Sequence, residues 1–404
     1  LITAIVLTAL VLRMYAAATL PTDYDEPVYY TAARFYANLI QNGRAENIPA
    51  VNYNYEHPVL AKLVYGGVLS FFPSDGPFWG DVWQLFGNNQ PLLSAAHPEK
   101  VFALRMVSVI FGTLETAVLA LISPLAGLML AVNSISIKYT SVIYLEAIPA
   151  ALSMLGVFLF GLSMGWLRQK EKLNLKQHRK EAAFLALSAV CLGAAAAAKY
   201  QYGIAALALG LVYLISVLRL RWTEFTRWAI LLVFAVVAAV SFICCDPYLY
   251  PDPVGRLTDS LQFSMDYQNG EAVAAAGYPF YQPLIWLSRP VTTFLIRESQ
   301  PMPMRGGEFL FHLDTAIFIL AVLGLPRLLK RQPVFFTWLV IGVIFLLVWN
   351  TKWPQYALLV VGPLCLSAAE GLKTLVVFAS RFLSRVKQPA AEKIEWLITG
   401  SSKS

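Results

Sequence analysis

The stretch TDYDEPVYYTAARFYANLIQNG, residues 22–43, decides how this chain is interpreted, because it follows a first apolar segment of roughly 20 residues, the length of a membrane span. If residues 1–20 span a membrane, Asp25 and Glu26 lie just outside it. Two adjacent acids at a membrane surface have three interpretations. They are catalytic carboxylates, a coupling-ion site, or acids of a solvated loop.

The composition is that of an integral membrane protein. Hydrophobic residues make up 58% of the 404 residues and charged residues 14%, whereas charged residues make up about 25% of a soluble domain. The formal charge is +7, and the basic residues that produce it lie in short loops between apolar runs. This distribution indicates membrane topology and argues against a nucleic-acid partner.

The apolar runs predict an all-α polytopic protein with about ten transmembrane helices. The run at 124–138 is the weakest, since it covers only about 22 Å of a hydrocarbon core roughly 30 Å thick, and it is a half-helix or is extended by its neighbours. We expect one membrane domain over 1–379 and a cytoplasmic tail over 380–404. The runs lie at about 1–20, 102–122, 124–138, 141–167, 182–199, 201–218, 228–245, 314–329, 334–350 and 355–379.

Basic loops orient the chain. The positive-inside rule places 168–180, 219–227, 326–333 and the tail in the cytoplasm. Two long segments, about 21–101 and 246–313, then lie on the opposite face, and loops of this length are usually functional. The sequence therefore predicts a multi-pass protein of the cytoplasmic (plasma) membrane with its site on the external face.

Two helices are expected in the first external segment. Aromatic and aliphatic residues recur at helical spacing over 29–40, with polar residues on another face, which is typical of a helix in the membrane interface. The apolar run within 53–73 is too short to span and predicts a second interfacial or re-entrant helix.

Three external turns each place a lysine beside aromatic residues: Lys138 in IKYTS, Lys199 in AAKYQY and Lys352 in NTKWPQY. Snorkelling to the interface accounts for any one of them. Together they oppose the positive-inside bias and predict a site for a lipid-linked phosphate, which ammonium and guanidinium groups neutralise. Arg105 and Arg13, near external helix ends, extend this predicted cluster.

Asp25 and Glu26 are the predicted catalytic acids. A positioned carboxylate such as Asp25 can take the proton of an attacking hydroxyl, and a phosphate leaving group needs no general acid. We expect Glu26 to orient Asp25 or a helix terminus rather than to transfer a proton.

Four further residues are candidates for orienting the donor or acceptor. Glu146 is an intramembrane acid, a functional candidate by default, which could pair with Lys138 or with another donor-binding base. His57 and Glu56 either orient a substrate or cap the second interfacial helix, and Tyr139 lies next to Lys138. No spacing resembles H-E-x-x-H and no nucleotide-binding glycine motif occurs. We therefore predict no cofactor and no metal ligands, although the sequence leaves a divalent metal open.

These motifs resemble those of the GT-C superfamily of membrane glycosyltransferases, and more closely its protein O-mannosyltransferase branch, which includes aminoarabinose-transferase-like members. The likeness lies in DEPVYYTAARFYANL, in EHPVLAKLVYGGVL, and in an Arg-x-x-Ser-x-x-x-Gly pattern at Arg105, Ser108 and Gly112. SIKYTSVIYLEAIPAAL, KYQYGIAAL and KWPQYALLVVGPL are similar to later turns, with Lys138 where an arginine is more usual.

The resemblance implies a polyprenyl-phosphate-linked sugar donor, a lipid, glycan or protein acceptor, Asp25 as base and inversion at the sugar carbon. The chain departs from many relatives in having His-Pro-Val after Glu56, and 246–312 carries no assigned motif. Two alternatives remain. One is a secondary transporter with Glu115, Glu146 and Lys138 as coupling site, and the other is a non-catalytic lipid-binding subunit.

Overall fold

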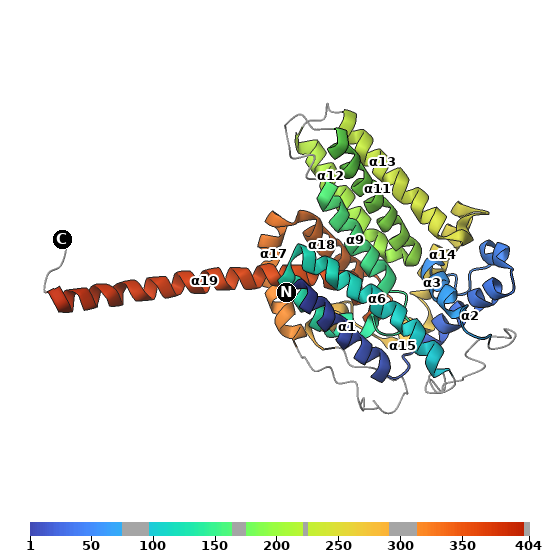
Figure 1. The fold of residues 1–404 in the computed structure, drawn as a ribbon, viewed down its shortest axis with the longest axis horizontal. Helices are drawn as coiled ribbons and strands as arrows, with labels where there is room; N and C mark the ends of the chain where they lie inside the picture. Colours follow the sequence, from blue (N-terminus) through green and yellow to red (C-terminus); the bar gives the residue numbers. More distant parts are fainter. Residues whose placement is uncertain (75–96, 164–174, 221–224, 291–312, 400–404) are drawn as a thin grey trace.

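A computed structural model describes residues 1–74, 97–163, 175–220, 225–290 and 313–399, and within these ranges the regular structure is helical throughout (Figure 1). The predicted external segments 21–101 and 246–313 therefore lie partly outside the described residues. The helices are α1 (Ile2–Thr19), α2 (Glu26–Gln41), η1 (Ala45–Ala50), α3 (Leu60–Leu69), α6 (Pro98–Ile122), α7 (Pro124–Val132), α8 (Ser134–Tyr139), α9 (Ala147–Ser163), α11 (Leu175–Ala198), η2 (Tyr200–Tyr202), α12 (Gly203–Leu220), α13 (Phe225–Cys245), η3 (Pro247–Leu249), α14 (Pro253–Tyr267), α15 (Glu271–Ala276), α16 (Gln282–Ser288), α17 (Asp314–Arg331), α18 (Pro333–Val348), η4 (Pro354–Ala357) and α19 (Leu358–Thr399).

The chain is a multi-pass membrane protein. Five helices of the described part are long and apolar enough to cross a membrane, and four shorter apolar helices accompany them. The predicted number of ten spans stays a prediction. The five are Ile2–Thr19, Pro98–Ile122, Tyr200–Leu218, Trp228–Cys245 and Pro354–Ser380.

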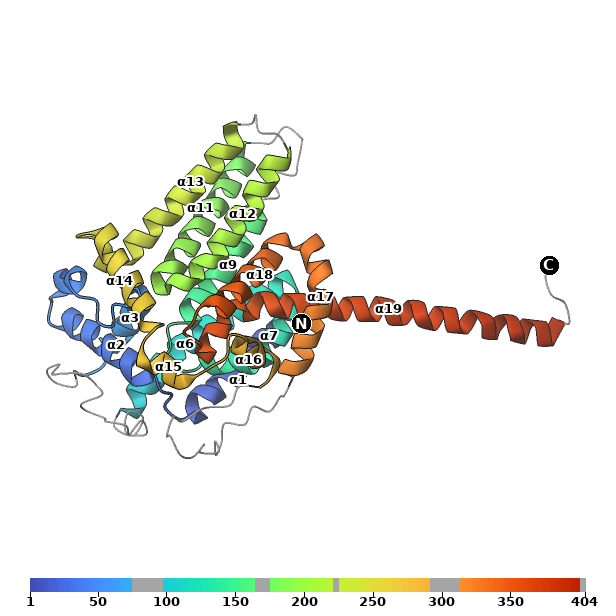
Figure 2. The same cartoon turned by 180° about the vertical axis from the view of Figure 1, so that it is seen from behind.

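The helices form two packed groups. In both views α9, α11, α12 and α13 lie side by side, while α1, α6, α7, α17 and α18 surround the first half of α19 (Figures 1 and 2). Glycines permit the closest crossing: a Cβ on Gly324 would lie 1.8 Å from the carbonyl oxygen of Ser367, and one on Gly371 would lie 1.9 Å from that of Leu320. Helices α17 and α19 therefore pack backbone against backbone.

Both helices expected in the first external segment are present, with shorter bounds for the second. Helix α2 begins at Glu26 with Pro27 in its first turn, as the helix N-terminus favours. Helix α3 covers only Leu60–Leu69 of the run predicted over 53–73, because Asn54 adopts a left-handed conformation with φ 58° before Pro58. Gly66 of α3 lets it pack on α2, since a Cβ there would lie 2.7 Å from Cβ of Tyr36.

The weak apolar run at 124–138 is two short helices, α7 and α8, broken at Asn133. The Asn133 side chain accepts a hydrogen bond from Ser136 N–H and so caps α8. Its Nδ2 donates to Asp314 at 2.8 Å, which ties the break to the start of α17. The break places the next segment, residues 140–146, against the α1–α2 junction, where the candidate site lies.

Candidate active site

Glu26 is clamped by four N–H groups. The side chain is fully buried, and its Oε1 accepts from Arg105 Nε and from Ile143 N–H, both at 2.8 Å. Its Oε2 accepts from Arg105 Nη2 at 2.6 Å and from Asp23 N–H at 2.8 Å. Such a bidentate pair fixes both position and orientation, so Glu26 locks the start of α2 against α6.

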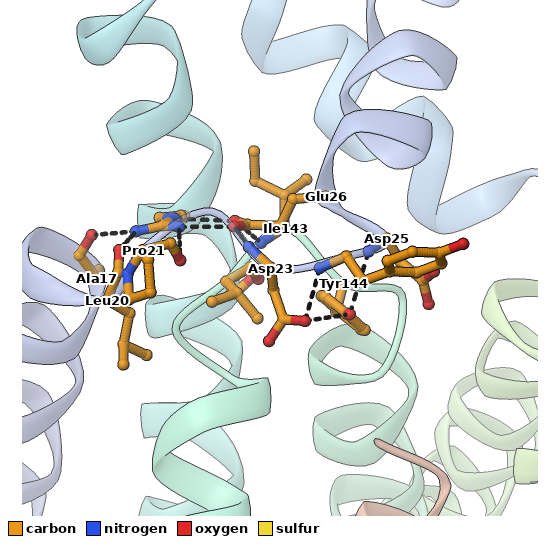
Figure 3. Close-up of polar contacts among 12 residues, drawn as sticks. Ala17, Leu20, Pro21, Asp23, Asp25, Glu26, Ile143 and Tyr144 are labelled. Carbon is orange, nitrogen blue, oxygen red and sulfur yellow. Dashed lines mark hydrogen bonds and ion pairs between the residues drawn. The ribbon is translucent and has the colours of Figure 1, made fainter. Parts of the chain in front are cut away.

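All the N–H groups of the Arg105 guanidinium are engaged in hydrogen bonds. Its guanidinium has five N–H groups, and the three that do not reach Glu26 donate to main-chain carbonyls at the end of α1 (Figure 3). A donor phosphate would have to displace one of these bonds to reach the guanidinium. The three carbonyls belong to Ala17, Leu20 and Pro21.

The Arg-x-x-Ser-x-x-x-Gly pattern follows one face of α6. Below Arg105, Ser108 Oγ donates to Val142 O at 2.7 Å. Gly112 leaves room for Thr140, because a Cβ there would lie 2.3 Å from Thr140 Oγ1. This face therefore seats the segment 140–146 that carries Tyr144 and Glu146.

Asp25 points away from the clamp (Figure 3). Its main-chain N–H donates to Tyr144 Oη at 3.3 Å, and its partly buried carboxylate accepts from Gln355 Nε2 at 3.0 Å. Desolvation raises the pKa of Asp25 to about 7, helped by the negative charges of Asp23, Glu146 and Glu56 and opposed by Lys199. A carboxylate with a pKa near neutrality is suited to act as a general base.

Asp23 and Lys138 form the first ion pair beside Asp25. Lys138 Nζ lies 2.8 Å from Asp23 Oδ2, 3.3 Å from Tyr139 Oη and 4.7 Å from the centroid of the Tyr139 ring. Tyr144 Oη donates to Asp23 Oδ1 at 3.0 Å and so bridges Asp23 to the Asp25 backbone. The pair lowers the pKa of Asp23, although burial alone would raise it. Asp23 therefore stays ionised while Asp25 titrates near neutral pH.

Glu146 and Lys199 form the second ion pair, and both side chains are buried. The sequence left two partners open for Glu146, Lys138 or another donor-binding base. In the structure Glu146 pairs with Lys199, whereas Lys138 pairs with Asp23. Lys199 Nζ also lies 4.8 Å from the centroid of the Tyr356 ring, just after Gln355. Glu146 Oε2 has no hydrogen-bond partner among the described residues.

The remaining predicted residues lie on two sides of this cluster. Lys352 donates to the carbonyls of Leu347 and Trp349 and so caps the end of α18. His57 Nε2 lies 3.5 Å from Glu56 Oε1, and its ring centroid is 6.2 Å from that of Tyr29. Burial, with Lys199 and Lys62 nearby, keeps the pKa of His57 well below its usual value, so this imidazole is neutral.

The structure thus brings Glu56, Glu146 and Lys199 close enough to act on Asp25 electrostatically, with Lys138 and Tyr139 alongside. Two predicted residues, Glu26 and Arg105, are instead bound to each other. Sequence reasoning missed Asp23, Tyr144 and Gln355, the direct neighbours of Asp25. A usable signal existed only for Gln355, an amide between aromatic residues in the same turn as Lys352.

No metal site is apparent in the described ranges: three or more His, Cys, Asp or Glu side chains are not grouped there as a metal ion would require. A cavity of about 370 Å³ opens beside Trp353, two residues before Gln355. Its polar lining comes from amides, two aromatic rings and the predicted phosphate ligand Lys352. These residues are Gln268, Asn269, Asn350, Tyr278, Trp353 and Lys352.

Comparison with known proteins gives both a family and a fold. The family model described as dolichyl-phosphate-mannose-protein mannosyltransferase matches residues 3–256, more than half of the chain. No curated protein matches in sequence. Among solved structures, the fold is similar to that of ArnT from Cupriavidus metallidurans, with a TM-score of 0.54 to the form bound to undecaprenyl phosphate and 0.55 to the apo form.

Both alignments cover 100% of this chain at 13% identity, and 66% and 65% of the ArnT chain, so this chain spans about two thirds of the length of ArnT. At this identity the likeness shows the fold alone, and that fold is the GT-C fold expected from the sequence. Together with the family match, it shows that the chain belongs to the dolichyl-phosphate-mannose-protein mannosyltransferase family.

Proposed function

We propose that this chain is a membrane glycosyltransferase that moves a sugar from a polyprenyl-phosphate donor to an acceptor hydroxyl on the non-cytoplasmic face. The observation that carries the proposal is Asp25: a partly buried carboxylate, held by Gln355 from the far end of the chain, with a pKa of about 7. It lies beside two buried lysines, Lys138 and Lys199, on segments that the sequence places externally.

The proposed reaction is a single displacement. The acceptor oxygen attacks the anomeric carbon while its proton passes to the Asp25 carboxylate. The bond between the anomeric carbon and the phosphate oxygen breaks, and the polyprenyl phosphate leaves with the electron pair. Attack opposite the leaving group inverts the sugar carbon, and one carboxylate suffices because a phosphate leaves without protonation.

Lys138 and Lys199 are the proposed principal ligands of the donor phosphate, and Lys352 and Arg105 are secondary ones. All four already have protein partners, so phosphate binding requires an exchange of partners. Exchange is less costly at the lysines than at Arg105, because an ammonium can rotate its three N–H groups between acceptors. The cavity beside Trp353 is the proposed approach for the acceptor, since its amides match hydroxyl groups.

The transporter alternative has less support. A coupling-ion site built from Glu115, Glu146 and Lys138 needs these groups to share an ion, but Lys138 and Glu146 are each paired with a different residue. The structure therefore favours the glycosyltransferase proposal.

The experiment is a transfer assay with the purified chain in lipid nanodiscs, using a panel of polyprenyl-phosphate sugars and mass spectrometry of donor and products. Asp25→Asn should abolish transfer and preserve donor binding. Asp259→Asn, an exposed carboxylate on α14 of the second external segment, is the matched control and should transfer normally. Normal turnover by the Asp25 variant would refute the base assignment, and no turnover of any donor by the wild type would refute the activity.

A further inference from the structure

Lys62 is a buried cation that the proposed reaction does not use. It lies on α3 in an otherwise apolar helix and is fully buried. Its ammonium is surrounded by four oxygen atoms of the preceding loop, at 2.5 to 2.9 Å. The four are Asn52 Oδ1 and the carbonyls of Tyr53, Asn54 and His57.

These contacts surround a loop, 52–57, that has an uncommon backbone conformation. Asn54 has φ 58°, a left-handed conformation that is uncommon for residues other than glycine. An ammonium has three N–H groups, and here all of them are engaged by the loop, which leaves none for a phosphate. Asn52 Nδ2 adds a second closure, donating to His57 O at 2.9 Å.

The loop carries two residues of the candidate site. Asn54 Nδ2 donates to Glu56 Oε1 at 3.1 Å, so the turn that Lys62 fixes also orients Glu56. Glu56 is one of the negative charges that raise the pKa of Asp25. His57, whose carbonyl Lys62 binds, lies against Tyr29 on the α2 side of the site.

Asp246 supplies the opposite charge. It is fully buried at the end of α13, and neither carboxylate oxygen makes a hydrogen bond of normal geometry within the described ranges. Burial raises the pKa of Asp246 to about 6, and Lys62 opposes that rise together with the nearby backbone of Val59 and Tyr248. An isolated buried charge is costly: burial lowers the pKa of Lys62 to about 7, and the charges of Asp246 and Glu56 oppose that fall. Lys62 and Asp246 thus favour each other's ionised form without forming an ion pair.

A second cation joins the same two external segments. Arg256 of α14 donates to Pro49 O, in the first segment, and to Tyr248 O at 2.7 Å, in the second. Its guanidinium carbon lies 4.5 Å from the centroid of the Tyr248 ring. The start of the second external segment is therefore fastened to the first beside the loop 52–57.

We propose that Lys62 is a positioning residue of the candidate site: its ammonium holds the loop 52–57 with Glu56 and His57 facing Asp25, and the buried carboxylate of Asp246 favours its charged form. Lys62 acts through the loop and does not touch a substrate. The effect of Lys62 on catalysis rests on the proposed function, whereas its effect on the loop conformation does not.

The structural test is hydrogen–deuterium exchange of the full chain in nanodiscs, which needs no substrate. In Lys62→Met, amides of the loop 52–57 should exchange at least about tenfold faster, because loss of the ammonium lowers the cost of opening the loop. Asp246→Asn keeps the side-chain shape and should speed the same amides by about threefold. The control Lys100→Met removes a lysine that donates to Pro73 O near the first helix turn of α6, and it should leave the loop unchanged.

The catalytic test separates positioning from general damage. If Lys62→Met frees Glu56, the negative charge that raises the pKa of Asp25 moves away, so the acid limb of the kcat/KM profile should move to lower pH and kcat should fall at least about tenfold. A loss of folded protein would instead lower kcat/KM equally at every pH. Unchanged loop exchange in Lys62→Met overturns the proposal. If that variant does not fold, unchanged loop exchange in Asp246→Asn overturns it instead. Faster loop exchange in Lys62→Met, together with a wild-type chain that transfers no sugar from any donor, supports the role of Lys62 in the loop and rejects the proposed function.

Discussion

Asp25 and Glu26 are adjacent acids whose replacement should have opposite consequences. Glu26→Gln keeps the size of the side chain but replaces Oε2 with an amide. That amide would meet two donors, Arg105 Nη2 and Asp23 N–H, which now lie 2.6 and 2.8 Å from Oε2. Both hydrogen bonds are lost, and Arg105 is left as a buried cation without a full counter-charge.

The magnitude follows from those contacts. A hydrogen bond between charged groups contributes about 1.5–3 kcal/mol, and a neutral one about 1 kcal/mol. Breaking a buried ion pair on one side costs about 3–5 kcal/mol in total. We therefore expect Glu26→Gln to lower the unfolding free energy by about 3–5 kcal/mol, or Tm by roughly 4–6 °C for a chain of this length.

Asp25→Asn should behave differently. The described part of the chain gives the Asp25 carboxylate one donor, Gln355 Nε2, and an asparagine oxygen can accept the same bond. Loss of a group with a raised pKa does not remove a stabilising charge, so Tm should change by less than about 2 °C. Transfer should stop, because an amide cannot accept the proton of the acceptor hydroxyl.

Thermal unfolding in nanodiscs, followed by intrinsic fluorescence, and the transfer assay on the same preparations measure both effects. A wild-type Tm for Glu26→Gln would refute the structural role of the clamp. An inactive but stable Glu26→Gln, with Asp25→Asn active, would transfer the base role to Glu26.

Three further predictions concern single groups. The acid limb of kcat/KM should have an apparent pKa of about 7, since Asp25 must be unprotonated to act as base and its ionised fraction falls as pH drops. Lys352→Met should weaken donor binding about threefold to tenfold, a typical loss for one phosphate contact; an unchanged Kd with a lower Tm would limit Lys352 to capping α18. Gly112→Ala should cost about 1–3 kcal/mol in chemical unfolding because its Cβ would meet Thr140, whereas Gly67→Ala, with open space around it, should be neutral or slightly stabilising.

Local patterns in the sequence were enough to predict the family, the helical class and the helix expected over 29–40, which is present as α2 (Glu26–Gln41). They did not define the ends of the short helices. Residues 53–59 are loop, with Asn54 in the left-handed conformation and its carbonyl bound by Lys62, a contact between near neighbours in the sequence. The weak run at 124–138 breaks at Asn133, which binds Asp314, and that contact cannot be identified from spacing along the chain.

The same limit applies to the site. The predicted topology placed Asp25, Lys138 and Lys199 on the same side of the membrane, because the positive-inside rule assigns each loop to one side. It could not assign partners, because the contacts that decide them join residues more than 50 positions apart, such as Glu146 with Lys199. Lys62 is a single lysine in the apolar stretch VLAKLVYGG, which indicates a buried cation with nearby partners, but a hydropathy average over the run does not reveal it.

The pairing of every predicted phosphate ligand constrains how an anionic donor could bind. A lysine that turns from its carboxylate to a phosphate leaves that carboxylate buried and unpaired, which is costly unless it takes up a proton. The carboxylates left in this way would be Asp23 and Glu146. Their neighbour Asp25 already titrates near neutral pH, because desolvation and three neighbouring carboxylates hold its pKa near 7. A phosphate added to the cluster raises that pKa further. Donor binding should therefore make Asp25 a stronger base as well as a more protonated one, and the acid limb of kcat, which reports the bound state, should lie at higher pH than that of kcat/KM.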